Sequence, residues 1–537
     1  MESLTKITTK ERKNIMFKLN IIKSLTLVMA LILGGAMITP TGLEAKNKFI
    51  FANSSPYDTM DPHALYDVGR VAYRINLYDG LLRWLDNPPK LSPWLADSYD
   101  ISEDGTSYTF HLNKGATFHD GSPVEASDVV YSIERILALK KGAYSLFTKS
   151  VEPGSTKVID KHTVQFNLVQ ASSIFLATVP AIHILNSTLV KSHEVDGDLG
   201  AVWLSQNDAG SGSFELDRYD PAIGFSAKRF ENHFMGWGDK YLDEIEFRTV
   251  IEINSRVLGL MNGDFHGTDG YLPQDQVKRL KASDNVNVQV EESMRIFYVI
   301  LNHNREIMQD INFRKALSYA FDYDSFINDI LGGSVARNPA PMPNNIWGNP
   351  TDEKGYTYDM DKAREYLAKV KKPIPEFVLG ALAGYGQTGQ AAALFQNSLT
   401  KLGLKTRIVE EPWSVVSKKM RDEQQMYDSL FIWKSTYYAD PNNWIGELYS
   451  CDQIGARNNS WYCNPEVDAL LNEARVEPDQ AKRAVNYKKA AKLVMDDAGG
   501  IFVYNTVWFG PYNKNVKGVR FSPIGNAQEM RWVYFEE

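Results

Sequence analysis

The chain has 537 residues, 44% of them hydrophobic, with 66 acidic against 58 basic side chains. This length exceeds what one hydrophobic core supports, so two or more lobes are expected, and the composition excludes bulk disorder. The formal net charge of −8 argues against nucleic acid as a partner.

The N-terminus has the pattern of a segment removed on export. Basic residues from Lys6 to Lys23 precede an apolar run over Ser24–Ile38, and Leu43-Glu44-Ala45 fits a cleavage site. This order predicts a secretory signal peptide over residues 1–45, with Met16 as an alternative start. A retained membrane anchor is the weaker alternative, because the apolar run is shorter than the ~20 residues a span needs. No cysteine lies near the cleavage site, so no lipid anchor is expected.

The next elements alternate between strands, turns and helices. Residues 48–52 predict a short strand that leads into the turn-rich segment Asn53–His63. Ser107–Leu112 alternates apolar and polar residues, as a half-buried strand does. Ser122-Pro123-Val124-Glu125 has the pattern of a capping box, so we expect a helix to begin there.

A glycine-rich segment further along the chain fits a nucleotide-binding pattern. Gly384–Gly389 has the spacing G-x-G-x-x-G, follows an apolar run and precedes an apolar helical pattern. Thr406–Val409 then predicts a strand that ends at Glu410, near the spacing of a ribose-binding carboxylate. The segment lies deep in the chain and the protein is predicted to be exported, so a dinucleotide site is the minor alternative and no cofactor is expected.

The stretch Tyr427–Cys463 has the composition of a small-molecule site. Residues 430–433 predict a buried strand, followed by an aromatic loop that contains one carboxylate, Asp440. The alternative is that the aromatic residues are core and Asp440-Pro441 is only a turn. Cys451 and Cys463 are the only cysteines, and they predict a disulfide under oxidising conditions. A metal site is the lesser alternative, because two thiols without nearby histidines make half a zinc site.

Several segments together carry a family resemblance. The run LSPWLADSYDISEDGTSYTFHLNKGATFHDGSPVEASDVVYSIERIL resembles the signature of the family 5 extracellular solute-binding proteins, the dipeptide- and oligopeptide-binding subunits of ABC importers and their relatives. The resemblance continues, in the family's order, through Ala209–Tyr219, Asn232–Arg248, Asn312–Leu331, Asn338–Pro350, Tyr358–Val370, Gln390–Gly403 and Cys451–Leu471.

This resemblance implies an α/β fold of two lobes joined by a hinge, the two-lobe periplasmic-binding-protein fold. The first lobe would take residues 46 to about 293 and recover residues 510–537, with an extra subdomain inserted at about 91–208. The second lobe would take about 294–509, and it accounts for the glycine-rich segment as part of its own strand–loop–helix. The Cys451–Cys463 segment would form the disulfide hairpin of the dipeptide binders.

The resemblance also implies a function. A monomer in the periplasm would capture a peptide or similar small organic solute between its lobes and deliver it to a membrane permease with its ATPase subunits. The alternatives are a different cargo (an opine, an oligosaccharide or a conjugate), a secreted enzyme, or a receptor that signals without transport. The enzyme alternative lacks support, since the sequence contains no H-E-x-x-H, G-x-S-x-G or P-loop pattern.

The chain departs from the family at two binding positions. Dipeptide binders hold the ligand's amine with an Asp a few residues before the Asp-Pro, where this chain has Tyr437. They hold the carboxylate with an Arg in the loop before the Gln390–Gly403 helix, a position that falls near Ala383 or Gly384. Because both charged groups are missing, we expect aromatic stacking to dominate. The predicted ligand-binding residues are Tyr57, His63, Ser211, Ser213, Asn302, His303, Tyr385, Trp413, Trp433, Tyr437, Tyr438 and Asp440, and no catalytic or metal-binding residue is predicted.

Overall fold

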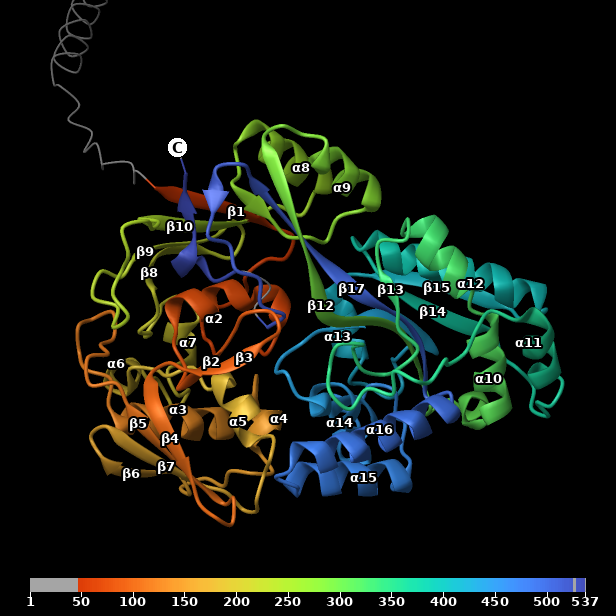
Figure 1. Cartoon of the computed structure of the whole chain (residues 1–537), viewed down its shortest axis with the longest axis horizontal. Coiled ribbons are helices and arrows are strands. Elements are labelled where there is room, and N and C mark those ends of the chain that lie inside the picture. The colour runs from red at the N-terminus through yellow and green to blue at the C-terminus, as the bar shows by residue number, and fades with distance from the viewer. Residues whose placement is uncertain (1–46, 525–527, 537) are drawn as a thin grey trace, which may run out of the picture. The chain divides into compact units, whose positions relative to one another are not determined.

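The computed structural model describes residues 47–524 and 528–536. The predicted signal peptide therefore lies outside the described residues. Among the helices that the structure describes, none combines the length and the apolar character needed to cross a membrane. The prediction of an α/β fold is confirmed: helices flank one 11-stranded mixed sheet with the order β15-β14-β16-β12-β17-β11-β1-β10-β9-β8, and β13 pairs with β17 (Figure 1).

The first lobe is built around β1, which confirms the strand predicted at residues 48–52. β1 pairs in parallel with β10 and β11, and β9 and β8 continue the sheet in antiparallel order. Its side chains Phe49 and Phe51 are buried, and Phe51 lies 5.3 Å from the ring of Phe247 on the neighbouring strand. The elements of this lobe are β1 (Lys48–Asn53), α2 (Val71–Leu77), β8 (Phe214–Asp220), β9 (Gly224–Arg229), β10 (Glu244–Thr249), α8 (Ile253–Asn262), β11 (Gly267–Thr268) and α9 (Gln274–Lys281).

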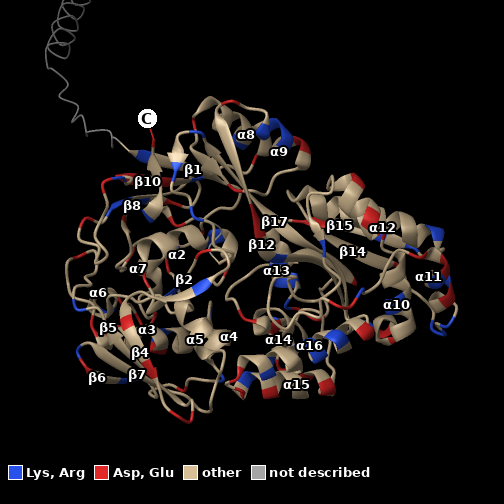
Figure 2. Cartoon of the chain, in the orientation of Figure 1, with Lys and Arg blue, Asp and Glu red and all other residues tan. Residues whose placement is uncertain are grey.

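The second lobe contains the apolar strand predicted at residues 430–433. This strand, β16, is buried on both faces, which explains its continuous apolar run. The outer helices α11 and α15 carry charges of both signs (Figure 2). The elements are α10 (Ile311–Ala320), β13 (Ala336–Arg337), α11 (Met360–Leu367), β14 (Phe377–Leu382), α12 (Gly386–Lys401), β15 (Thr406–Glu411), α13 (Trp413–Lys419), β16 (Ser429–Lys434), α14 (Ile445–Tyr449), α15 (Pro465–Val476) and α16 (Gln480–Asp496).

Two long antiparallel strands, β12 (Val286–Leu301) and β17 (Gly500–Asn513), run through both lobes (Figure 1). The lobe boundaries predicted near residues 293 and 510 fall inside these strands. The pairing is interrupted between Glu292 and Ile296, where three residues of β12 oppose a single residue of β17. Such a bulge bends the strand and redirects the side chains of the extra residues. The bulge therefore determines where Ser293 and Arg295 point.

A separate four-stranded sheet, β4-β5-β7-β6, lies within the predicted insert and has its own apolar core. The helix start predicted at Ser122–Glu125 is wrong. Val124 N–H donates to Ala116 O (3.0 Å), which holds this segment extended, and α3 begins at Ala126, with Asp128 accepting from Glu125 N–H. The remaining elements are β2 (Leu82–Leu85), β3 (Lys90–Pro93), β4 (Ala96–Ile101), β5 (Ser107–Leu112), α3 (Ala126–Leu139), α4 (Tyr144–Phe147), β6 (Lys157–Asp160), β7 (Thr163–Asn167), α5 (Phe175–Thr178), α6 (Ser187–Ser192), α7 (Ala201–Leu204), β18 (Val516–Lys517) and β19 (Tyr534–Phe535).

The predicted disulfide between Cys451 and Cys463 is present. The two cysteines are 12 residues apart, and closing a loop of this length stabilises a protein by about 3 kcal/mol in the chain-entropy model. The double variant Cys451→Ser, Cys463→Ser is therefore expected to unfold at a lower denaturant concentration than the oxidised protein. Equal unfolding midpoints for the two proteins would show that the disulfide contributes no stability.

Candidate functional site

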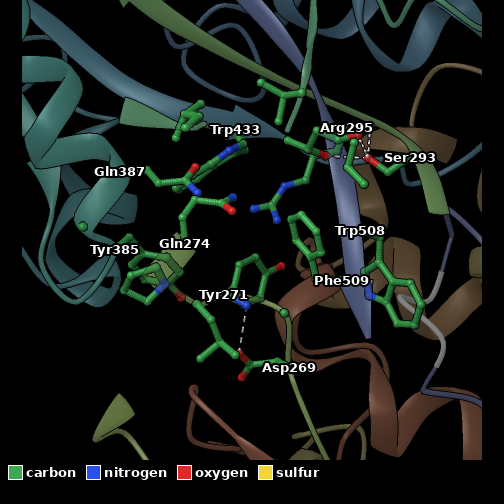
Figure 3. A pocket seen from close by; sticks show the side chains of 18 of the residues that line it. Asp269, Tyr271, Gln274, Ser293, Arg295, Tyr385, Gln387, Trp433, Trp508 and Phe509 are labelled. Carbon is green, nitrogen blue, oxygen red and sulfur yellow. Dashed lines mark hydrogen bonds between the residues drawn. The ribbon is translucent and has the colours of Figure 1, made fainter. Parts of the chain in front are cut away.

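A cavity of about 370 Å³ lies where the two lobes meet along β12 and β17 (Figure 3). From the first lobe it is lined by the segment Asp269–Asp275, which runs from the end of β11 into the first turn of α9. From the second lobe it is lined by the loop between β14 and α12 and by Trp433 on β16. Because both lobes contribute side chains, a ligand bound here would contact both of them.

Aromatic rings from both lobes surround one cation in this cavity. The guanidinium of Arg295 lies 4.8 Å from the ring centre of Tyr271 and 5.1 Å from that of Trp433. Tyr385 joins the cluster, with its ring 5.7 Å from Tyr271 and 6.0 Å from Trp433. Figure 3 shows the guanidinium pointing into the space between these rings. The cluster offers flat apolar surfaces beside a positive charge, an arrangement suited to a planar anionic group.

A chain of hydrogen bonds fixes one polar side of the cavity. Trp433 Nε1–H donates to Tyr504 Oη (3.2 Å), and the Tyr504 hydroxyl donates to Gln387 Oε1 (2.7 Å). Burial raises the pKa of Tyr504, so its hydroxyl stays protonated. Since the amide oxygen of Gln387 is used, its NH₂ group is the part that it can offer to a ligand. Gln274 has the opposite arrangement: its NH₂ group donates to Ser334 Oγ (3.0 Å), which leaves its oxygen as an acceptor.

The bulge on β12 is held by side chains rather than by regular strand pairing. Ser293 Oγ–H donates to Thr506 O (2.9 Å) and accepts from Arg295 N–H (3.2 Å), while Thr436 Oγ1–H donates to Met294 O (3.0 Å). These bonds satisfy backbone groups that the ladder leaves unpaired. They fix the backbone from which the Arg295 side chain enters the cavity.

Of the residues predicted to bind ligand, Tyr385 and Trp433 line this cavity. The glycines of the G-x-G-x-x-G segment also find a structural role here. Gly384, at φ +83°, and Gly386 line the cavity, whereas Gly389 lies against the end of the exposed side chain of Glu410. The spacing that resembled a nucleotide site therefore belongs to the loop before α12, where the positive φ of Gly384 favours glycine.

The other second-lobe residues lie outside the cavity lining. Trp413 Nε1–H donates to Asp67 of the first lobe (3.4 Å), and the ring of Tyr437 packs at a tilt against Tyr66 of the first lobe (4.5 Å). Tyr438 is buried and accepts a hydrogen bond from Asn442 (2.9 Å). Asn302 and His303 bond to backbone oxygens of Tyr427 (3.2 Å) and Gly499 (3.1 Å) respectively.

Asp440 has a structural environment, in line with the turn alternative. Its Oδ2 accepts from Arg483 Nη2–H (2.7 Å), and its Oδ1 accepts from Asn442 N–H (3.0 Å) at the start of a short helical turn. Both carboxylate oxygens are thus used inside the second lobe. We therefore leave Asp440 out of the proposed site.

The first-lobe candidates are also buried away from the cavity. Tyr57 is fully buried with its ring edge-on to Phe225 (5.0 Å). Ser211 Oγ–H donates to Asp79 Oδ2 (3.0 Å), and Ser213 is 2% exposed. His63 Nε2 lies 2.8 Å from His183 O. These side chains support the first lobe rather than face the cavity.

The burial of His63 predicts a loss of stability in acid. Burial, with the nearby Arg135, lowers the pKa of His63 to about 4. Between pH 6.5 and pH 4 the unfolded chain therefore binds a proton that the folded protein does not, so stability falls as the pH falls through this window. The loss should reach on the order of 3 kcal/mol by pH 4.

Chemical denaturation of His63→Gln and wild type at pH 7 and pH 4.5 tests this prediction. The free energy of unfolding of His63→Gln should depend less on pH than that of the wild type. An unchanged pH dependence in His63→Gln would contradict the prediction.

Four residues of the cavity lining are not among those predicted from the sequence: Tyr271, Arg295, Gln387 and Tyr504. Gln387 lies inside the glycine-rich segment and could have been singled out with Tyr385. Arg295 is a lone cation in the otherwise apolar run from Met294 to Leu301, and a charge in such a strand is a signal for a functional position. Tyr271 and Tyr504 carry no comparable signal in the sequence.

Comparison with known proteins agrees with this architecture. The model of the bacterial extracellular solute-binding proteins, family 5 Middle, matches residues 90–456. The probable D,D-dipeptide-binding periplasmic protein of Escherichia coli K12 is 30% identical, covering 93% of this chain and 96% of its own. Heme-binding protein A of Haemophilus influenzae is 28% identical over 84% of this chain and 85% of its own.

Two solved structures show the same fold. The periplasmic binding protein DppA from Helicobacter pylori, in complex with the peptide STSA, superposes with a TM-score of 0.83 at 24% identity, covering 91% of this chain and 98% of its own. The binding protein AgaA from A. tumefacien R10, in complex with agropinic acid, gives 0.79 at 21% identity, covering 91% and 99%. The fold is that of a two-lobe solute-binding protein. The chain belongs to the family 5 bacterial extracellular solute-binding proteins, which are not enzymes.

Proposed function

We propose that this protein captures a peptide or a similar small organic solute in the cavity around Trp433 and Arg295. In this proposal it acts as a monomer in the periplasm, without turning the solute over, and delivers the solute to an ABC-type permease with its ATPase subunits. The observation that carries the proposal is the position of the cavity at the junction of the two lobes, with aromatic side chains contributed by each. The peptide-binding relatives support the class of cargo.

The mechanism follows from the placement of the cavity. A ligand that contacts both lobes stabilises the arrangement in which the lobes meet, and a permease can recognise that arrangement. Direct contacts between the lobes reinforce it: the ring of Tyr66 packs against that of Tyr437, and Ser173 N–H of the insert donates to Arg475 O (2.8 Å). Release then requires these contacts to break together with those of the ligand.

A non-peptide cargo is the second candidate, and one observation favours it. At the position where dipeptide binders have the amine-binding Asp, the Tyr437 ring packs against Tyr66 and lies 4.4 Å from the guanidinium of Arg457. It provides no carboxylate for a ligand ammonium group. An opine or another conjugate without a free terminal amine would not need one.

Native mass spectrometry of the protein purified from the periplasm, followed by a melting-temperature screen of peptides, opines and oligosaccharides, tests the proposal. A ligand present at 100 times its Kd stabilises the folded state by about 2.7 kcal/mol. We expect one retained or added solute per chain and a clear upward shift of the melting temperature. A protein that neither retains nor responds to any small solute would contradict the proposed function.

A further inference from the structure

The cavity contains one cation, Arg295, that has no counter-charge. Among the described residues, its guanidinium makes no ion pair with a carboxylate, and its buried Nε has no hydrogen-bond partner. Its neighbours are the faces of Tyr271 and Trp433. Stacked rings hold a guanidinium in plane and leave its N–H edge free, which is the edge that binds a carboxylate with two parallel hydrogen bonds.

The bulge on β12 is the reason that this charge lies in the cavity. The bulge residues Ser293 and Arg295 both line the cavity, and side-chain hydrogen bonds from Ser293 and Thr436 hold the bulge in place. A guanidinium positioned by a fixed backbone and two rings loses little further freedom on binding a ligand. The arginine is thus arranged for recognition rather than for closing a structural ion pair.

The carboxylates of the cavity do not provide a matching site for an ammonium group. Asp269 Oδ2 accepts from Ser54 N–H (2.5 Å) and its Oδ1 accepts from Tyr271 N–H (3.2 Å), so both of its oxygens are used. Asp275, the other acidic residue that lines the cavity, is exposed. A solute with a free carboxylate finds a dedicated partner here, whereas a free amine does not.

We infer that the cavity selects organic acids: Arg295 binds a carboxylate of the solute, and the rings of Tyr271 and Trp433 enclose the flat or apolar group beside it. A free amine contributes little to affinity. The loop before α12, where the family's dipeptide binders have an arginine, has none in this chain, and Arg295 supplies the cation from β12 instead. This inference rests on the proposed function, because it names the chemical class that the same cavity takes.

Matched forms of simple ligands test the inference. Calorimetry measures the binding of five compounds to the wild-type protein. They are the dipeptide Ala-Phe, its C-terminal amide, its N-acetyl form, and the pair N-acetylphenylalanine and N-acetylphenylalanine amide. Acids are expected to bind about 10- to 100-fold more tightly than their amides, the range for a hydrogen bond to a charged group. Acetylation of the amine is expected to change the Kd of Ala-Phe by less than about threefold.

The variants separate ligand recognition from a structural role of Arg295. Arg295→Gln should bind each acid and its amide equally, and Arg295→Lys, which keeps the charge, should retain part of the preference for acids. The control Arg305→Gln removes an arginine that pairs with Asp428 (3.0 Å) outside the cavity lining, and it should keep the wild-type preference. If Arg295 had only a structural role, replacing it would weaken the binding of acids and of amides to the same extent.

Several results would overturn the inference, and they differ in what they imply for the proposed function. If the wild-type protein binds acids and amides equally, or if Arg295→Gln keeps the preference for acids, the inference fails while the proposed solute-binding function stands. If the wild-type protein binds no compound of this panel but binds a neutral or cationic solute from the wider screen, the inference also fails and the proposed solute-binding function stands. If it binds no solute of any kind, the proposed function and the inference fail together.

Discussion

Replacing Glu447 by alanine is expected to lower the free energy of unfolding by about 3–5 kcal/mol. Glu447, on α14, is 4% exposed, and one of its oxygens accepts from both Lys434 Nζ (2.6 Å) and Arg457 Nε (3.1 Å). Burial alone would raise the pKa of Glu447, but the two cations outweigh burial and hold that pKa below its ordinary value. Without Glu447, the buried Lys434 and the partly buried Arg457 lose the anion that pairs with both of them.

The two cations should respond differently to this loss. Burial, with Arg457 nearby, lowers the pKa of Lys434 to about 7, so Lys434 can lose its proton. Arg457 keeps its charge at any physiological pH, and its guanidinium lies against the Tyr66 and Tyr437 rings that join the lobes. We therefore expect Glu447→Ala to weaken the contact between the lobes as well as the second lobe itself.

Chemical denaturation of Glu447→Ala and wild type measures this effect. A suitable control is Glu365→Ala, which removes an exposed partner of Lys369 and should cost less than about 1 kcal/mol. If the free energy of unfolding of Glu447→Ala lies within 1 kcal/mol of the wild-type value, Glu447 and its partners Lys434 and Arg457 are far more hydrated than the burial of Glu447 indicates.

Replacing Trp433 by alanine is expected to weaken solute binding by at least about 30-fold, the effect of losing a binding hot spot. The substitution removes one of the two rings beside Arg295 and the donor that orients Tyr504 and, through it, Gln387. The substitution therefore removes contacts that position three side chains of the cavity, Arg295, Tyr504 and Gln387. The apo protein should still fold, because the strand that carries Trp433 keeps the buried residues Leu430 and Phe431.

The loss is measured as the Kd of the solute found in the screen, together with the melting temperature of the free protein. Trp203→Ala is the matched control: its ring stacks on His193 (4.4 Å) outside the cavity lining, so its removal should leave the Kd unchanged. Trp433→Phe should retain part of the affinity, because it keeps a ring beside Arg295. Unchanged binding by Trp433→Ala would remove this residue from the site.

The sequence predicted the fold better than the site because the two depend on different kinds of information. The buried strand at residues 430–433 and the disulfide between Cys451 and Cys463 follow from local patterns and from export, and both are present. The helix start near Ser122 was wrong for a local reason as well: a backbone bond from Val124 to Ala116 outweighed the capping pattern. The two lobes were expected from length, and their arrangement was implied by the family resemblance.

The cavity depends on contacts that no local pattern reveals. Asp440 looked like a ligand-binding carboxylate, but its partner Arg483 is 43 residues away in the sequence. Arg295 reaches the cavity because three residues of β12 oppose one of β17, and a bulge of this kind cannot be read from the alternation of either strand alone. Nothing in the sequence around Tyr504 distinguishes it from other strand residues, because its hydrogen bonds to Trp433 and Gln387 form only in the folded protein.

The most direct test of this account is a crystal structure of the protein with the solute that gives the largest shift in melting temperature. We expect electron density for one solute molecule in the cavity, with an apolar or flat part between Tyr271 and Trp433 and an acidic group at the guanidinium of Arg295. A solute bound in another place, with this cavity filled only by water, would contradict it.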